Sequence, residues 1–307
     1  MNIRDPDTRP SDQWSDWLLK RRHGGNPDHE PVVRSLVARI RDRVLDGAGL
    51  QPGMVIVDVG AGDGLMTFGA FERVGSSLSA ILLDISEPLL MRAEERAVEY
   101  GVRDRCTFLK TPAEELDGVI DGCADVVMVR AVLAYVANKE AAVRGFHRIL
   151  KPGGRLSLSE PINRDEAIKN AAYAELLRTP AAEAISSRVQ LLHRCRQAQL
   201  PSTPEEIRNG PLTNFTERDL VTLFQNAGFD EIHMELHIDI SRQAAVEWNT
   251  YIDIAPRPGA PTLREVFASH LDEAERRILE EDLRPVVESG RHKTRDTTAY
   301  LIALKSD

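Results

Sequence analysis

The sequence has 307 residues, of which 42% are hydrophobic and 28% charged, with a formal net charge of −9. These fractions are typical of a globular protein, and the length fits one large α/β domain or two small ones. The acidic balance argues against a nucleic-acid-binding protein, since such proteins usually carry a basic surface. The isolated Cys106, Cys123 and Cys195 form no metal-binding spacing, so we expect free thiols, a reducing cytoplasmic location and no metal site.

The amino-terminal residues 1–50 are predicted to form a helical cap. Trp14, Trp17 and Leu18 fall at helical spacing, and an apolar stripe runs from Val32 to Ile40. The first residues are acidic and lack an apolar run, so we expect no secretion signal. No stretch reaches the roughly 18 apolar residues of a membrane span, so we also expect no membrane segment.

Strands and helices alternate over residues 51–162. Helices are predicted from Ser86, a plausible N-cap, to Tyr100 and from Asn138 to Leu150, where Lys151–Gly154 ends the second. This alternation indicates a mostly parallel sheet with helices on both faces. Five short apolar strands are predicted at Met54–Val59, Ala80–Leu83, Cys106–Leu109, Ala124–Val129 and Arg155–Glu160.

Two helical insertions, residues 163–211 and 241–293, interrupt this pattern. The core is predicted to resume over residues 212–240, with a helix that begins at Thr216 and a strand at Asp230–Ile240, and over 294–307, with a strand at Thr297–Leu304. Neither insertion carries enough apolar residues for a core of its own. We therefore interpret both, together with the amino-terminal cap, as covers over one pocket.

A glycine-rich turn, Gly60-Ala-Gly-Asp-Gly64, follows the first strand and opens a helix. Glycine lets the backbone turn sharply and approach a ligand closely, and the helix amino terminus presents free N–H groups. A dinucleotide fingerprint would need a glycine where Leu65 stands. Asp58 and Asp63 make the turn negative, which favours a cofactor with an ammonium and a sulfonium, S-adenosylmethionine, over NAD.

The second strand ends in Asp84, where a carboxylate is able to accept hydrogen bonds from both hydroxyls of a ribose. Ile85 and Leu89 would supply neutral walls beside it.

Several segments together resemble the class I S-adenosylmethionine-dependent methyltransferases, particularly the ubiquinone and menaquinone biosynthesis enzymes. The similarity covers residues 50–160 well and 213–240 more loosely. It implies a Rossmann-like, mostly parallel seven-stranded sheet with an antiparallel final strand. The segments that carry it are Asp58–Gly64, Asp84, Pro112–Leu116 and Ile149–Leu156.

The resemblance also implies roles for individual residues. The methionine part of the cofactor would lie against the glycine turn, the ribose against Asp84, and the adenine beside Ala113 and Glu114. The family often has an acidic residue where this chain has Pro112, so either Glu114 bonds the adenine amino group or that bond is absent. The implied methionine-side residues are Asp58, near the amino group, with Gly60, Ala61, Gly62, Gly64, Arg130, Ala131 and Val132.

Methyl transfer from a sulfonium is an in-line displacement, which alignment and exclusion of water accelerate, and a base is needed only when the acceptor must lose a proton. Arg130 would either hold a substrate carboxylate or pair with Glu160. Trp248, Tyr251 and the proline-rich Ala255–Pro261 would either wall an organic substrate or form the cap's own core. The candidate catalytic residues are Arg130, Tyr135, Glu160 and His23.

The expected function is methylation of a small organic molecule, of tailoring or secondary-metabolism type, in a capped pocket. Nucleic-acid base methylation is disfavoured because Val129–Val132 replaces the Asn/Asp-Pro-Pro-Tyr type of motif. Two alternatives stay open: a peptide substrate, and a non-catalytic regulatory protein that binds S-adenosylmethionine. The acceptor atom and the oligomeric state are undetermined.

Overall fold

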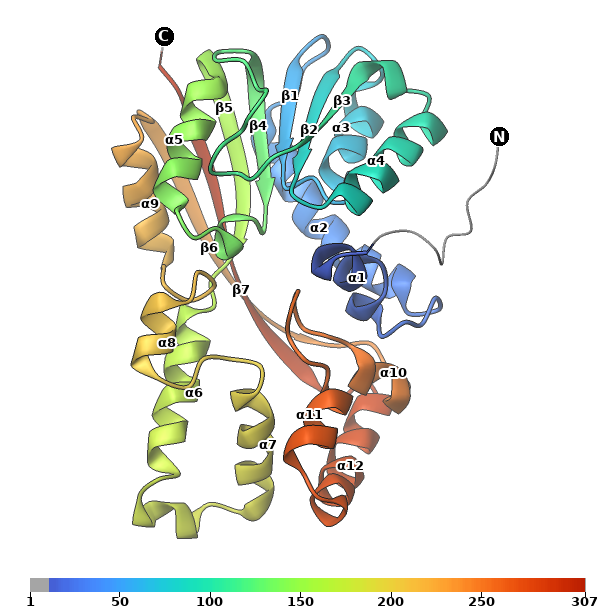
Figure 1. The fold of residues 1–307 in the computed structure, drawn as a ribbon, viewed down its shortest axis with the longest axis vertical. Coiled ribbons are helices and arrows are strands. Elements are labelled where there is room, and N and C mark those ends of the chain that lie inside the picture. Colours follow the sequence, from blue (N-terminus) through green and yellow to red (C-terminus); the bar gives the residue numbers. More distant parts are fainter. Residues whose placement is uncertain (1–10, 307) are drawn as a thin grey trace.

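The computed structural model describes residues 11–306 and contains one seven-stranded sheet with the order β3-β2-β1-β4-β5-β7-β6 (Figure 1). Strands β1 to β5 pair in parallel, whereas β7 is antiparallel to both β5 and β6. The predicted Rossmann-like class, including its antiparallel final strand, is therefore confirmed. The strands are β1 (Val55–Val59), β2 (Ser79–Asp84), β3 (Cys106–Lys110), β4 (Ala124–Arg130), β5 (Leu150–Pro161), β6 (Glu231–Arg242) and β7 (Lys293–Leu304).

Helices cover both faces of this sheet and enclose two separate apolar clusters. The cluster on one face includes Leu45, Phe68 and Ala93, while the other includes Phe146 and Phe224. The central strands β1 and β4 supply β-branched residues to both clusters because both of their faces are buried. The first face is covered by α2 (Glu30–Ala48), α3 (Leu65–Val74) and α4 (Glu87–Glu99), the second by α5 (Lys139–Ile149) and α9 (Glu217–Asn226).

Two helix starts follow the predicted capping signals. The Ser86 hydroxyl accepts the Leu89 N–H at 3.4 Å, and Thr216 and Asp219 form a reciprocal capping box. At the carboxyl ends of the parallel strands lies α1 (Gln13–Leu19), followed by the short 3₁₀ turn η2 (Arg21–His23). Residues 1–10 of the predicted amino-terminal cap lie outside the described part of the chain.

The two insertions form a group of helices below the sheet, into which the β6–β7 hairpin extends (Figure 1). A third apolar cluster joins them, because Leu191 and Cys195 of the first insertion pack with Trp248 and Phe267 of the second. Trp248 thus belongs to the core of the insertions. The helices are α6 (Arg164–Leu176), α7 (Ser187–Gln197), α8 (Pro204–Asn209), α10 (Trp248–Asp253), α11 (Leu263–His270) and α12 (Glu273–Glu288). The predicted domain boundaries stay an interpretation.

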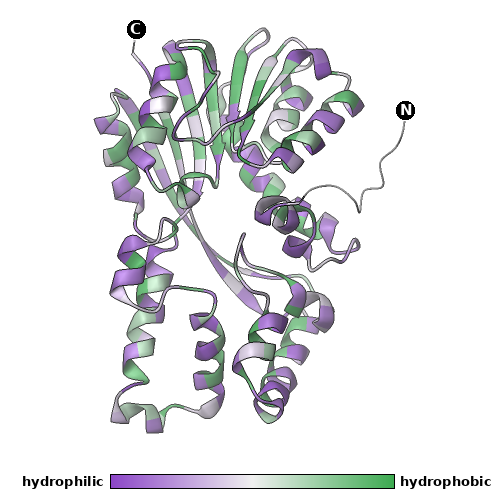
Figure 2. Ribbon diagram, viewed as in Figure 1, coloured by the Kyte–Doolittle hydropathy of each residue, from purple (hydrophilic) through white to green (hydrophobic). Residues whose placement is uncertain are grey.

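Three predicted strand boundaries were wrong. β5 begins at Leu150 rather than Arg155, since Gly153 and Gly154 exchange backbone hydrogen bonds with Lys305 instead of forming a free turn. β6 extends to Arg242, and β7 begins at Lys293 rather than at Thr297. These two residues pair with each other beyond the core. Figure 2 shows this outer part of the hairpin as hydrophilic, in contrast to the hydrophobic strands of the core.

Within residues 11–306, no helix is both long and apolar enough to cross a membrane. The remaining short 3₁₀ turns are η3 (Arg103–Arg105), η4 (Leu133–Tyr135) and η5 (Pro180–Ala184).

Candidate functional site

The glycine turn lies between β1 and α3, at the carboxyl end of the sheet's central strand. Gly60 and Gly64 have φ of +67° and +83°, in the left-handed region that favours glycine. A Cβ at Gly64 would also lie 2.3 Å from the Phe68 ring. A residue other than glycine would therefore be strained at these two positions of the turn.

Asp58, just before this turn, is fully buried and fastens β1 to α3. Its Oδ2 accepts hydrogen bonds from the Thr67 backbone N–H at 3.1 Å and from the Thr67 hydroxyl at 2.7 Å. Burial raises the pKa of Asp58 to about 7, although the Thr67 bonds oppose this shift. Its predicted contact with the cofactor's amino group stays a prediction.

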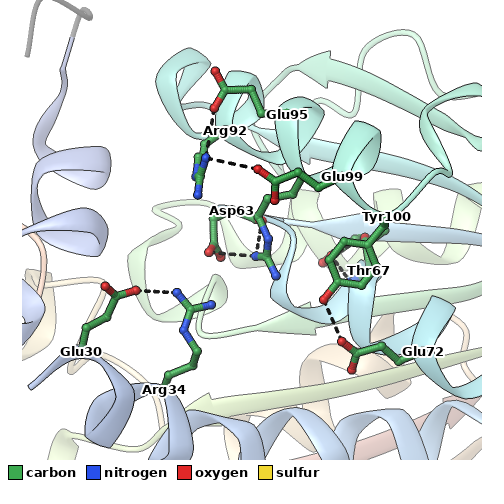
Figure 3. Close-up of polar contacts among 11 residues, drawn as sticks. Glu30, Arg34, Asp63, Thr67, Glu72, Arg92, Glu95, Glu99 and Tyr100 are labelled. Carbon is green, nitrogen blue, oxygen red and sulfur yellow. Dashed lines mark hydrogen bonds and ion pairs between the residues drawn. The ribbon is translucent and has the colours of Figure 1, made fainter. Parts of the chain in front are cut away.

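Asp63, inside the turn, is paired with Arg96 of α4. Arg96 donates to the Asp63 carboxylate at 2.9 Å and to its carbonyl oxygen at 2.7 Å. Figure 3 shows Asp63 with these contacts. The Arg96 guanidinium also lies 4.7 Å from the Phe68 ring centroid. The Asp63 charge is thus largely compensated by a neighbour in the protein.

Asp84 ends β2 and holds the glycine turn from the other side. Its Oδ2 accepts the Gly62 N–H and its Oδ1 the Ser86 N–H, both at 2.8 Å. Burial raises the pKa of Asp84. Asp84 therefore fixes the turn and the start of α4 while it also faces a cavity.

This cavity, the glycine-turn cavity, has a volume of about 290 Å³. It lies at the carboxyl ends of β1 and β4, where connections leave the sheet in opposite directions, the usual ligand position in open α/β sheets. Its wall unites predicted residues from four segments. The lining residues are Trp14, Gly60, Asp84, Ile85, Thr111, Pro112, Ala113, Glu114, Ala131, Val132, Tyr135 and Val136.

Other predicted cofactor residues do not line this cavity. Gly62 is bonded to Asp84 and lies under Leu18 of α1, and Leu89 is buried at the start of α4. Trp14, Thr111 and Val136 were not predicted. Trp14 carried only a helical-spacing signal, because its contact with the cavity arises from the packing of α1. The remaining predicted residues outside the lining are Asp58, Ala61, Gly64 and Arg130.

A second cavity, the β5 cavity, has a volume of about 250 Å³ and lies beside the first. Ala131 lines both, with the strained φ of +53° and its N–H bonded to the Ser159 carbonyl oxygen at 2.8 Å. The two cavities therefore meet at Ala131. The β5 cavity is lined by Ile40, Arg130, Ala131, Ser159, Glu160, Pro161, Ile162, Asn163, Glu166, Arg295, Asp296, Thr297 and Thr298.

Glu160 anchors the turn that follows β4. Its carboxylate accepts the backbone N–H groups of Val132 and Leu133 at 2.9 Å and of Ala134 at 3.0 Å. Burial raises the pKa of Glu160 to about 7, against the effect of these bonds. Among residues 11–306 no ion pair joins Glu160 to Arg130, so the alternative of a structural pair between them was wrong. Glu160 bonds the backbone instead.

The other candidate catalytic residues lie at different depths. The Tyr135 ring meets the Trp14 ring edge-on with centroids 5.2 Å apart, and burial raises the pKa of Tyr135 to about 12. Arg130 lines the β5 cavity, and burial lowers its pKa. His23 is buried with Nε2 2.9 Å from the Leu19 carbonyl oxygen, and it lines neither cavity. The structure thus brings together Arg130, Tyr135 and Glu160 but not His23.

Comparison with known proteins identifies the family to which these features belong. Residues 50–228 match the model of a methyltransferase domain. The chain belongs to this methyltransferase domain family. The S-adenosylmethionine-dependent methyltransferase family predicted from the sequence is therefore confirmed.

Curated relatives match only part of this chain. The ubiquinone/menaquinone biosynthesis C-methyltransferase UbiE of Idiomarina loihiensis is 31% identical over 129 residues, which cover 42% of this chain and 51% of the relative. The UbiE of Ectopseudomonas mendocina is 34% identical over 113 residues, which cover 37% and 44%. The chain thus spans about half the length of the curated relatives it matches.

Solved structures share the fold over more of the chain. The YcgJ protein from Bacillus subtilis has a TM-score of 0.55 at 16% identity and covers 88% of this chain and 99% of its own. A candidate sarcosine dimethylglycine methyltransferase from Galdieria sulphuraria has a TM-score of 0.51 at 16% identity, covering 96% and 97%. At such identities the likeness concerns the fold.

Proposed function

We propose that this chain transfers the methyl group of S-adenosylmethionine to a small organic molecule by in-line displacement. The observation that carries the proposal is the contact of the two cavities at Ala131, which lines both. A cofactor in the glycine-turn cavity would then have its reacting end next to an acceptor in the β5 cavity. Such adjacency is what a displacement needs, because donor and acceptor atoms must be held close and in line.

The residues of the glycine-turn cavity fit this cofactor. The Asp84 carboxylate would accept hydrogen bonds from the ribose hydroxyls, and the exposed Ile85 side chain and Ala113 would flank the adenine. Glu114 is the acidic side chain nearest Pro112 on this wall, so it would bond the adenine amino group. When bound, S-adenosylmethionine supplies an electrophilic methyl group on a sulfonium.

The surrounding residues would align the reactants and exclude water. Trp14 and Tyr135 form an aromatic wall of the glycine-turn cavity, and Glu160 fixes the turn that carries Tyr135. Exclusion of water strengthens the electrostatic interactions inside a site and prevents hydrolysis. Cavities of about 290 and 250 Å³ favour a small acceptor over a peptide, and we propose that the enzyme is of the tailoring type.

Calorimetric binding of S-adenosylmethionine and S-adenosylhomocysteine tests the cofactor site. Asp84→Asn is expected to weaken both by about tenfold, or ~1.4 kcal/mol, through the lost ribose contact. Asp125→Asn is the matched control: the Asp125 carboxylate also accepts a backbone N–H, that of Val55 at 2.7 Å, but at the opposite end of the sheet. Absence of binding by the wild type, or binding of NAD instead, would overturn the proposal.

Turnover separates the enzyme from a non-catalytic binding protein. S-adenosylhomocysteine release should be measured with a panel of small organic acids, amines and phenols and with peptides. Release with a small molecule is the expected result. Tight cofactor binding without release for any small acceptor would favour the regulatory alternative, and release with peptides alone the peptide alternative.

A further inference from the structure

The charges of three arginines from distant segments act on the Tyr135 hydroxyl group. Arg22 belongs to η2, Arg130 ends β4, and Arg257 lies in the connection between α10 and α11, which rises toward the sheet (Figure 1). The positive charge of each guanidinium acts to lower the pKa of Tyr135, against the larger opposing effect of burial. Ring contacts also bring Tyr135 and Arg22 to the same helix, because the Tyr135 ring meets Trp14 of α1 and the Arg22 guanidinium lies over Trp17 of α1.

Backbone contacts hold two of these segments together. The Ala255 N–H donates to the Arg21 carbonyl oxygen, and the Trp17 indole N–H donates to the Ala255 carbonyl oxygen, both at 2.9 Å. The Arg22 guanidinium lies over the Trp17 ring, 5.2 Å from its centroid. The residues that precede Arg257 are thus fixed against the helix that carries Arg22.

Carboxylate partners are missing from this arginine group. Among residues 11–306, none of the three forms an ion pair or a hydrogen bond through its side chain. Neighbouring arginines differ: Arg21 pairs with Glu265 at 2.5 Å and Arg264 with Asp253 at 2.6 Å. Some exposed arginines also lack partners, but every other partly buried arginine of residues 11–306 forms an ion pair or a hydrogen bond, so the three around Tyr135 are exceptional in being partly buried without one.

The nearest carboxylates are already bonded elsewhere. Asp63 is paired with Arg96 at 2.9 Å, and the Glu160 carboxylate accepts backbone N–H groups. Burial, followed by the charge of Arg130, lowers the pKa of Arg22 to about 10. Partly buried cations without partners cost free energy, because they lose contact with water and repel one another.

We propose that Arg22, Arg130, Arg257 and the Tyr135 hydroxyl form an anion site that binds a carboxylate of the methyl acceptor, which is therefore an organic acid. This inference rests on the proposed function and names its substrate class. Guanidinium groups bind planar carboxylates through paired hydrogen bonds, and a phenol donates one more. Arg130 lines the β5 cavity and Tyr135 lines the glycine-turn cavity, so the anion site lies where the two cavities meet, and we assign the anion to the acceptor that the β5 cavity would hold.

Benzoate and its uncharged amide, benzamide, are suitable probes because the site combines cations with the aromatic Trp14–Tyr135 pair. Each is titrated into protein saturated with S-adenosylhomocysteine. We expect the wild type to bind benzoate at least about tenfold more tightly than benzamide. The Arg257→Gln variant should lose this preference, whereas Arg257→Lys should retain part of it. Arg264→Gln, which removes the same charge from an arginine already paired with Asp253, should leave it unchanged.

Equal binding of the two probes, no benzoate binding, or equal losses in Arg257→Gln and Arg264→Gln would overturn the proposal. A second comparison identifies the source of the carboxylate, since 5′-methylthioadenosine lacks the amino-acid part of S-adenosylhomocysteine. Arg257→Gln should leave the affinities for both nucleosides unchanged. If Arg257→Gln weakened the binding of S-adenosylhomocysteine but not that of 5′-methylthioadenosine, the site would bind the cofactor's own carboxylate, and the acceptor assignment would be overturned.

Failure of the proposed function would look different. The wild type would then bind neither S-adenosylhomocysteine nor 5′-methylthioadenosine. The benzoate and benzamide titrations would be repeated without a nucleoside, and they would still test whether the arginine group binds an anion.

Discussion

Gly60 packs directly against Val132 in the wall of the glycine-turn cavity. A Cβ at Gly60 would fall 2.3 Å from the Val132 Cγ2, well inside any allowed separation. This contact joins the turn after β1 to the turn after β4, and both turns line the cavity. The close approach of these two turns therefore depends on the absence of a side chain at Gly60.

Gly60→Ala should destabilise the protein through both strain and overcrowding. Gly122 is the matched control, because its φ of +62° resembles the +67° of Gly60 but no atom lies within 4 Å of its added Cβ. We expect Gly122→Ala to lower the free energy of unfolding by about 1–2 kcal/mol and Gly60→Ala by about 1–3 kcal/mol more. Urea denaturation measures both. Equal losses of unfolding free energy in the two variants would show that Val132 moves away from the new methyl group without an energetic cost.

Arg96→Met should loosen the glycine turn. It removes both hydrogen bonds to Asp63 and the contact of the guanidinium with Phe68, at a cost of about 1–3 kcal/mol in unfolding free energy. Arg92→Met on the same helix is the control, since Arg92 is exposed and pairs only with surface carboxylates (Figure 3). It should change stability by less than about 0.5 kcal/mol. Similar losses in both variants, measured by urea denaturation, would contradict this role of Arg96.

Glu160 should make stability depend on pH. Its pKa is about 7 in the folded protein against an ordinary 4.5, so between these values the folded state binds more protons than the unfolded state. The free energy of unfolding therefore falls as pH rises through this window, by up to about 3 kcal/mol. Asp58, whose pKa is also raised to about 7, adds an effect of the same sign.

Glu160→Gln tests this dependence because glutamine does not ionise. The variant should be less stable overall, since its amide N–H₂ replaces an oxygen that accepts a backbone hydrogen bond. Its unfolding free energy should nevertheless fall less steeply than that of the wild type between about pH 5 and about pH 7.5. Parallel curves for the two proteins would contradict the assignment.

The core of the fold was predictable because its signals are local. Strand β1, the glycine turn and the helix start at Ser86 are each encoded by a few adjacent residues. The carboxyl ends of parallel strands lie at one edge of a sheet, so the approach of Asp84 to Gly60 followed from the order of elements. The site residues nearest to these strand ends were therefore accessible from the sequence.

Long-range packing was not predictable in the same way. The outer part of the β6–β7 hairpin is polar, so no alternation of apolar residues marked the pairing of Arg242 with Lys293. Arg257 lay in a proline-rich segment interpreted as a possible wall, but nothing in that pattern indicates the direction of its side chain. Its position beside Tyr135 depends on the bond of Ala255 to Arg21, which joins opposite ends of the sequence.

That bond, with the bond from Trp17 to Ala255, has a mechanical consequence. Leu18 of α1 lies over Gly62 on the cofactor side, whereas the loop beyond Ala255 carries Arg257 on the acceptor side. A displacement of α1 that uncovers the glycine turn must either break these two bonds or carry the loop with it. While both bonds hold, α1 and this loop move together, so exposure of the cofactor side is coupled to exposure of the acceptor side.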